Sequence, residues 1–150
     1  MIGAEVYENG VAKLVAEIER RGLSNIRIFM DDARALVARL APRSIARVFV
    51  LFPDPWPKER HKKRRLVSRP LLDDLARAMA AGAELRLATD DPDYGEAMRE
   101  CTAAHPEFAL VAEGRAPWAE RPDDWPPSRY EQKAIARGRA PLYLRLRRRG

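Results

Sequence analysis

The sequence contains very few of the residues from which disulfide frameworks and metal sites are built. Its 150 residues include a single cysteine, Cys101, and two histidines, His61 and His105. One thiol cannot form an intramolecular disulfide, and it is compatible with a reducing cytoplasm, where we expect the protein to reside. The cysteine and the two histidines have no spacing typical of zinc sites, so the sequence predicts no metal.

Long apolar runs and glycine-rich turns are also missing. No apolar run approaches the ~20 residues of a membrane-spanning helix, and the first residues lack the basic-then-apolar pattern of a secretion signal. No G-x-G-x-x-G turn follows an expected strand, which argues against a nucleotide-dependent dehydrogenase. Hydrophobic residues make up 46% of the chain, enough for a core, and we expect residues 1–150 to form a single domain.

Short apolar segments alternate along the chain with amphipathic segments of helical period. Strands are expected at residues 1–7, 25–30, 45–52, 83–89, 107–113 and 141–148, and helices at 8–22, 32–41, 68–82, from 90 onward and at 128–138. Residues 114–127 are interpreted as a long ordered loop. This alternation predicts an α/β fold with a largely parallel sheet, in which the continuous apolar run 45–52 is a strand buried on both faces.

Four acidic residues stand at or just beyond the ends of four different expected strands: Glu5, Asp32, Asp54 and Asp90. Because open parallel sheets bind ligands beyond the carboxyl ends of their strands, we expect these carboxylates to meet at one edge. Glu5 could accept hydrogen bonds from a ribose diol, as acids in nucleotide-binding βαβ units do. Asp32 could contact an adenine amino group, although a role as a helix N-cap would explain it as well.

Residues 51–66 read "LFPDPWPKERHKKRRL", an acid between two prolines followed by a dense basic run. Pro53 and Pro55 fix their own φ angles and keep Asp54 out of helical geometry, which favours a stiff turn that holds one carboxylate still. The bland alternative is a solvated acid in a strand-to-helix turn. Trp56 could stack on a base or cover the edge of the core.

The basic run carries six formal positive charges and one histidine within eight positions. Its members are Lys58, Arg60, His61, Lys62, Lys63, Arg64 and Arg65. A solvated helix face or a nuclear import signal would produce a similar run, but a single acid, Glu59, balances this one. A phosphate backbone is the natural partner of so dense a patch, and the net charge of +6 agrees with a polyanionic partner.

Two further groups of polar residues have ordinary structural explanations. In "ATDDPDYG", one of Asp90 and Asp91 should cap the helix whose first turn holds Pro92, which leaves the other acid for chemistry. Ser128 and Glu131 have the S-x-x-E spacing of a capping box, and that spacing alone requires no other role.

Taken together, these segments resemble the tRNA (guanine-N7-)-methyltransferases, a family that uses S-adenosylmethionine. "FPDPWPKERHKKRR" looks like the central signature of that family, and "IGAEVYENGV", "GLSNIRIFMDDA", "ATDDPDY" and "SRYEQKAIARG" match further blocks in the same order. The resemblance covers essentially the whole chain. It implies a Rossmann-like class I methyltransferase sheet, mostly parallel with an antiparallel C-terminal strand. The implied reaction moves a methyl group from S-adenosylmethionine to N7 of a tRNA guanosine in the variable loop.

The resemblance also implies roles for individual residues. Glu5 and Asp32 would bind the ribose and adenine of S-adenosylmethionine, and Asp54 would be the active-site acid that borders both cofactor and guanine. The guanosine would be held by Lys58, Asp90, Ser128, Arg129, Tyr130 and Glu131, and the run from Arg60 to Arg65 would lie against tRNA backbone. Serine replaces the family's usual threonine at Ser128 and keeps the hydroxyl, so a substrate role there is favoured over the cap alone.

One block of the family's pattern is missing from these residues. The family has a glycine-rich strand-to-helix turn upstream of "IGAEVY", which approaches the methionine end of the cofactor, and residues 1–150 contain no such turn. We therefore expect a sheet without the family's first βα unit, in a fragment, a chain with a misplaced start, or a degenerate protein. The alternative function is a noncatalytic RNA-binding module unable to bind the methyl donor. The sequence leaves the oligomeric state open between monomer and homodimer.

Overall fold

A computed structural model describes residues 1–111 and 121–150. The described residues form two compact units, Met1–Ala41 and Pro42–Gly150, and each is described by itself. That the chain is a single domain stays a prediction. In neither described range is there a helix long and apolar enough to cross a bilayer.

The first unit is a small βαβ arrangement followed by a short helix. It contains β1 (Ile2–Ala4), α1 (Glu8–Arg20), β2 (Arg27–Phe29) and α2 (Ala33–Val37). β1 and β2 pair in parallel, with Ile2 opposite Arg27. The expected end of α1 is confirmed, because Gly22 follows it with a φ of 63°, in the left-handed region that glycine adopts without strain.

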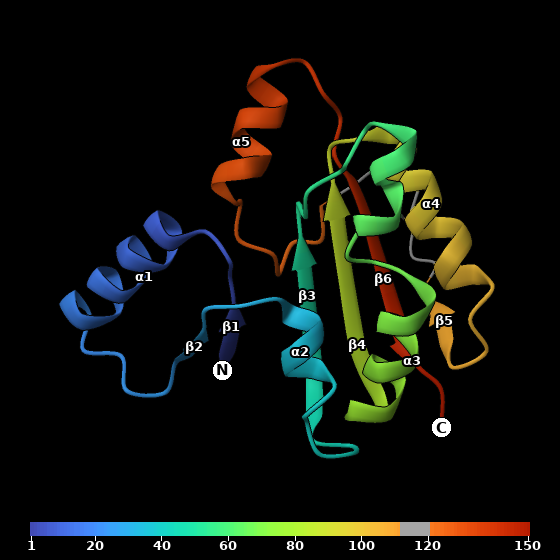
Figure 1. Ribbon diagram of the computed structural model, residues 1–150, viewed down its shortest axis with the longest axis horizontal. Helices are drawn as coiled ribbons and strands as arrows, with labels where there is room; N and C mark the ends of the chain where they lie inside the picture. The colour runs from blue at the N-terminus through green and yellow to red at the C-terminus, as the bar shows by residue number, and fades with distance from the viewer. Residues whose placement is uncertain (112–120) are drawn as a thin grey trace. The chain divides into compact units, whose positions relative to one another are not determined.

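The second unit is a four-stranded sheet with helices (Figure 1). Its elements are β3 (Ile45–Leu51), the 3-10 helix η1 (Glu59–Arg64), α3 (Arg69–Ala78), β4 (Met79–Thr89), α4 (Pro92–Ala103), β5 (Phe108–Leu110), α5 (Arg129–Ala136) and β6 (Leu142–Arg148). The strand order is β3-β4-β6-β5. β3 and β4 are parallel, whereas β6 is antiparallel to β4 and β5, which confirms the predicted α/β sheet with an antiparallel C-terminal strand.

One face of this sheet is apolar and carries the core. Leu85 and Leu87 of β4 lie opposite Leu146 and Leu144 of β6, and all four are at most 1% exposed. Helices α3 and α4 cover this face (Figure 1). The packing of α4 is tight, because a Cβ added at Gly95 would lie 3.2 Å from the side chain of Leu142.

The opposite face of the same strands carries charges. Side chains alternate along β4, so Glu84 and Arg86 point away from the leucines. Arg86 is 1% exposed, and its guanidinium lies 5.5 Å from the ring centroids of both Phe49 and Trp125, which contact each other. Its guanidinium donates to Glu84 and to both carboxylate oxygens of Asp124, which fixes the segment that carries Trp125.

Three local expectations differ from the structure. The run 45–52 is not buried on both faces: among the described residues β3 pairs with β4 alone, and Phe49 and Leu51 on its second face are 47% and 42% exposed. Helix α3 ends at Ala78 rather than near Gly82, because Met79 already takes extended geometry and pairs with Ile45. The strand expected at 107–113 spans Phe108–Leu110. Residues 112–120, which include half of the loop expected at 114–127, lie outside the described residues.

Candidate active site

Asp54 lies in the loop that leaves the carboxyl end of β3, between two residues of unusual backbone geometry. Phe52 has a φ of 53° and Trp56 a φ of 45°, both in the left-handed region that bulky residues avoid. The Phe52 N–H donates to the carbonyl of Ala88 on β4 at 2.7 Å, which ties the start of the loop to the sheet. Such strain persists only where the surroundings impose it, and it is concentrated at functional sites.

The Asp54 carboxylate is exposed and borders a cavity of about 200 Å³ whose other lining residues are Pro55, Trp56 and Pro57. Trp56 forms one wall and packs back on η1, with its ring 5.8 Å from His61 and 4.9 Å from the Arg64 guanidinium. The structure therefore orders Trp56 through η1. Asp54 thus lines a small hollow whose other walls are two prolines and a tryptophan.

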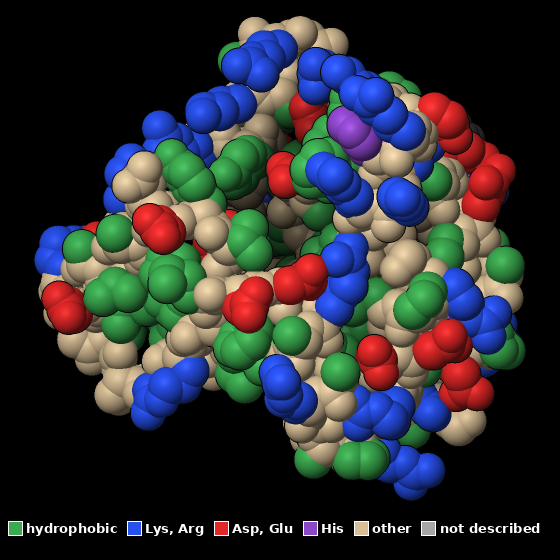
Figure 2. All heavy atoms as spheres, viewed as in Figure 1, with side chains coloured by type: hydrophobic (Ala, Val, Ile, Leu, Met, Phe, Trp, Pro, Cys, Tyr) green, Lys and Arg blue, Asp and Glu red, His purple; other side chains and the backbone are tan. Residues whose placement is uncertain are grey.

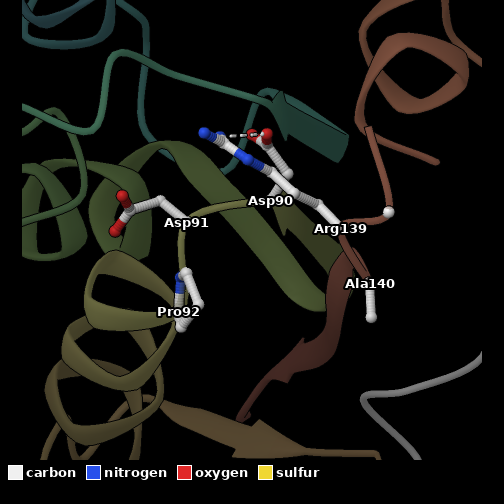
Figure 3. A pocket seen from close by; sticks show the side chains of 6 residues that line it. Asp90, Asp91, Pro92, Arg139 and Ala140 are labelled. Atoms are coloured by element: carbon white, nitrogen blue, oxygen red, sulfur yellow. Dashed lines mark hydrogen bonds and ion pairs between the residues drawn. The ribbon is translucent and has the colours of Figure 1, made fainter. Parts of the chain in front are cut away.

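Asp90 lies at the carboxyl end of β4, the parallel neighbour of β3, and lines a second cavity of about 430 Å³. Figure 3 shows Asp90 and Arg139 pointing toward one another, and their Oδ2–Nη1 distance is 2.9 Å. Asp91 is turned away and caps α4, accepting from the Tyr94 N–H at 2.8 Å. The prediction that one of the two aspartates caps the helix is confirmed for Asp91. Asp90, the acid expected to be left for chemistry, pairs with Arg139, and its role in chemistry stays a prediction.

The basic run forms η1 and presents most of its charge outward. Figure 2 shows Lys and Arg side chains gathered over the part of the surface where Figure 1 places η1. The exposed members are Lys58, Arg60, Lys63 and Arg64. Lys62 is half-buried and pairs with Glu59 at 2.8 Å and with Asp93 at 3.3 Å, and these carboxylates raise the pKa of Lys62.

Arg65 differs from the rest of the run. It is 7% exposed, and its Nε donates to the carbonyl of Pro55 at 2.8 Å. Its Nη2 donates to Asp93, and its guanidinium lies 4.7 Å from the centroid of the Tyr94 ring. A phosphate contact would require the guanidinium to leave these partners, so the structure gives Arg65 an inward position that the sequence interpretation did not foresee.

Helix α5 begins with the predicted capping box. The Ser128 hydroxyl accepts from the Glu131 N–H at 3.0 Å, and a Glu131 carboxylate oxygen accepts from the Ser128 N–H at 3.1 Å. The other oxygen of Glu131 accepts from the Tyr143 hydroxyl at 2.6 Å and pairs with Arg121 at 3.0 Å. Burial and this carboxylate raise the pKa of Tyr143 well above its usual value.

The four residues predicted to hold guanosine at the start of α5 differ in exposure and in their contacts. Glu131 is buried and its oxygens are occupied, whereas Arg129 and Tyr130 are exposed on the first turn. Ser128 lies between them in exposure and shares its hydroxyl with the cap. The cap is therefore present, and the substrate roles of these residues stay predictions.

The first unit carries the two acids predicted to bind the cofactor. Glu5 follows β1, and its Oε1 accepts from the N–H groups of Val6 and Tyr7 at 2.8 and 2.9 Å, which orients the carboxylate. Asp32 follows β2 and is the N-cap of α2, accepting from the Arg34 N–H at 2.8 Å. The expected meeting of Glu5 and Asp32 with Asp54 and Asp90 at one edge stays a prediction.

Two residues of the site region were not singled out in the sequence. Asp93 receives both Lys62 and Arg65, and these cations lower the pKa of Asp93. An acid in the first turn of a helix is explained by the helix dipole alone, so the sequence position of Asp93 did not indicate its contacts with Lys62 and Arg65. Arg139 stands one residue after Gly138, whose φ of 72° ends α5, and no local pattern links it to Asp90.

A family model described as "Putative methyltransferase" matches residues 1–143. A tRNA (guanine-N(7)-)-methyltransferase from Rhodospirillum rubrum is 46% identical over 149 residues, 99% of this chain and 58% of that protein. One from Granulibacter bethesdensis is 44% identical over 157 residues, covering 99% and 67%. The chain belongs to the tRNA (guanine-N7-)-methyltransferase family. It spans about six-tenths of the length of most of the curated relatives it matches.

Solved structures agree with this family at the level of the fold. An rRNA methylase from Streptococcus thermophilus matches with a TM-score of 0.63 at 13% identity, over 99% of this chain and 73% of that one. A protein from Streptococcus mutans described as a "putative methyltransferase", solved in complex with SAH, matches with a TM-score of 0.60 at 7% identity, over 98% of this chain and 74% of that one. The second unit and the βαβ unit thus belong to the class I methyltransferase fold, as the family resemblance predicted.

Proposed function

We propose that the protein takes part in the transfer of a methyl group from S-adenosylmethionine to N7 of a guanosine in tRNA, in the variable loop. The observation that carries this proposal is that two site acids and a basic surface occur together in one compact unit. Asp54 and Asp90 follow neighbouring parallel strands, and η1 extends directly from the Asp54 loop. Because tRNA is the substrate, we place the reaction in the cytoplasm.

The chemistry asks mainly for positioning. Guanine N7 already has a lone pair, so no general base is needed to create the nucleophile, and the reaction gains most from an aligned base. The purine becomes cationic as its bond to the methyl carbon forms. A fixed, exposed carboxylate at Asp54 stabilises that developing charge and can accept hydrogen bonds from guanine N1–H and N2–H. Asp90 and Lys58 complete the guanosine contacts in the proposal.

The methyl donor supplies an electrophilic methyl group on a sulfonium when bound. Glu5 would hold its ribose, and the geometry fits this role because the Val6 and Tyr7 N–H groups orient the carboxylate through one oxygen. Asp32 would contact adenine while keeping its cap on α2. Asp54 would border both ligands.

The proposed RNA contacts come from the outward side of η1. Arg60, Lys63 and Arg64, with Lys62 and His61 on the same short helix, would lie against phosphates on either side of the guanosine. We do not propose an RNA contact for Arg65, because its guanidinium is buried. Arg129 and Tyr130 are exposed and available to the flanking nucleoside.

The direct test is methyl transfer by the purified chain. It is incubated with tRNA and S-adenosylmethionine that carries a labelled methyl group, and the tRNA is digested and analysed for 7-methylguanosine by mass spectrometry. We expect labelled 7-methylguanosine, and a single-turnover rate at least ~10²-fold lower for Asp54→Asn, because the neutral amide cannot stabilise the cationic purine. A near-normal rate for Asp54→Asn would contradict the role of the carboxylate.

The second candidate is a noncatalytic RNA-binding module. The observation that favours it is that the basic surface and the guanosine-side acids lie in residues 42–150, whereas Glu5 and Asp32 lie in the other unit. This candidate predicts salt-dependent tRNA binding without labelled product. Titration calorimetry with S-adenosylmethionine separates the two, since a module of this kind would give no heat of binding.

A further inference from the structure

Arg65 connects three segments that are distant in the sequence. It follows η1, donates to the carbonyl of Pro55 in the Asp54 loop, and donates to Asp93 in the first turn of α4. The Tyr94 ring stacks on the same guanidinium, and the Tyr94 hydroxyl accepts from the Val67 N–H at 2.9 Å. Tyr94 is fully buried, so the residues on both sides of Leu66 are held against α4.

The position of the Pro55 carbonyl gives this contact its significance. Asp54 lies between the N–H of Phe52, which is bonded to Ala88, and the carbonyl of Pro55, which is bonded to Arg65. The loop is thus fixed once to β4 and once to Arg65, and the two strained φ angles at Phe52 and Trp56 lie at the ends of this short stretch. Prolines limit the shapes that the loop can take, but they do not select its place relative to the sheet.

We propose that Arg65 is a positioning residue for Asp54: it clamps the loop to α4 through Asp93 and Tyr94 and makes no contact with RNA. A planar guanidinium can donate in its own plane to two acceptors while its face stacks on an aromatic ring. Lysine keeps the charge but has neither the fixed fork nor the flat face. The clamp therefore requires arginine, whereas a contact with one phosphate could also be made by lysine.

The idea rests on the proposed function for the meaning of Asp54, so its test begins with a measurement that needs no catalysis. Amide exchange is followed at Phe52 and His61, whose N–H groups donate to Ala88 and to Lys58 on either side of Asp54. We expect exchange at these amides to rise at least ~10-fold in Arg65→Lys, because the substitution removes a charge-assisted hydrogen bond. Exchange at Leu87 in the core of β4 should not change. Wild-type exchange at Phe52 and His61 in Arg65→Lys would overturn the proposal.

Asp93→Asn weakens the same contact from its other partner. Because the Asp93 side chain is exposed, we expect this variant to fold even if a substitution at the buried Arg65 prevents folding. We expect it to raise exchange at the same two amides, and the double variant with Arg65→Lys to add little beyond the larger single effect, because both changes remove one interaction. Fully additive effects would show that the two residues act separately and would contradict the clamp.

A positioning role of Arg65 is distinguished from phosphate binding by comparing Arg65→Gln with a matched control, Lys63→Gln. Lys63 is an exposed cation on η1, two positions before Arg65. The slope of tRNA affinity against salt, both on logarithmic scales, should become shallower by about 0.7 to 0.9 in Lys63→Gln, the value for one phosphate that the protein no longer neutralises. The slope should stay unchanged in Arg65→Gln. An equal change in both variants would make Arg65 a phosphate-binding residue and overturn the proposal.

Methyl transfer completes the set of measurements. At saturating tRNA we expect Arg65→Lys and Asp93→Asn to transfer at least ~10-fold more slowly, with tRNA affinity within about twofold of the wild type. An unchanged rate in an active protein would contradict a positioning role. If the wild-type chain transfers no methyl group, the proposed function fails, while the exchange and salt measurements still decide whether the clamp exists.

Discussion

At the scale of single residues, the partners of a charged side chain distinguish a residue available to a ligand from one that holds the fold together. Asp54 and Glu131 are both acids of the family pattern, yet Asp54 is exposed beside a cavity, whereas Glu131 is buried under Tyr143 and Arg121. Arg65 and Lys63 are two positions apart in one basic run, and one is buried while the other faces solvent. Charge type alone does not predict which role a residue takes.

The pH dependence of the Arg65–Asp93 contact follows from the pKa of Asp93. Arg65 and Lys62 hold this pKa below its ordinary value of 3.8, so the ionised acid stabilises the folded state at neutral pH. That stabilisation is fully present above pH 3.8 and is lost as the pH falls through the lower, folded-state pKa. We expect the difference in free energy of unfolding between wild type and Asp93→Asn to be constant from about pH 7 to 5 and to shrink below about pH 3.8, in urea titrations at each pH. A difference that already shrinks between about pH 7 and 5 would assign the effect to another group.

At the scale of elements, one sheet presents two chemically different faces. Leucines of β4 and β6 build the core under α3 and α4, while the other face of the same strands carries Arg86 and Glu84. Buried charges of this kind are stable only when they are paired, and here Asp124 and Glu84 supply the pairing. The pairing anchors the segment of Trp125 to β4.

Replacing Arg86 should therefore be costly. We expect Arg86→Gln to lower the free energy of unfolding by about 2 kcal/mol, because it removes buried charge-assisted hydrogen bonds to Asp124 and Glu84, while Arg145 and Arg47 still pair with Glu84. Arg147→Gln is the matched control, since Arg147 is 54% exposed and lies 4.0 Å from the same carboxylate, and it should change stability by less than ~0.5 kcal/mol. Urea denaturation of the three proteins provides the comparison, and equal effects of the two substitutions would argue against a buried pair.

Strands and helices were predictable from the sequence to the extent that their signals are local. The local signals are the apolar runs, Gly22 after α1, an aspartate cap before α4 and the box of Ser128 and Glu131. Each acts within one turn or one strand, and each was found in place, with Asp91 as the cap that the sequence had left open between Asp90 and Asp91. The burial of Arg65 and the pairing of Asp90 with Arg139 depend on residues 28 and 49 positions away. Chain periodicity contains no information about such partners, so these features required the fold.

At the scale of the whole molecule, charge is divided unevenly between the two compact units. Residues 1–41 contain six basic and six acidic residues, so the entire net charge of +6 lies in residues 42–150. That unit also contains η1 and α5. The electrostatic attraction for a polyanion should therefore be a property of the second unit.

A fragment of residues 42–150 should accordingly bind tRNA with the same salt dependence as the full chain. We expect equal slopes of the logarithm of affinity against the logarithm of salt concentration between about 50 and 200 mM, measured by fluorescence anisotropy. Circular dichroism of the fragment confirms that it is folded during the measurement. A slope that is clearly smaller for the fragment would place part of the phosphate-binding surface in residues 1–41.

The clamp on the Asp54 loop also affects when that loop can reach its final conformation during synthesis. The loop emerges early from the ribosome, but the residues that hold its bent backbone, Ala88, Asp93 and Tyr94, are synthesised more than 30 positions later. Until β4 has paired with β3 and α4 supplies Asp93 and Tyr94 to Arg65, the contacts that oppose the strain at Phe52 and Trp56 are incomplete. The whole signature motif is thus synthesised well before its loop can take its final conformation. The last contacts that fix the loop come from α4, a helix outside the motif.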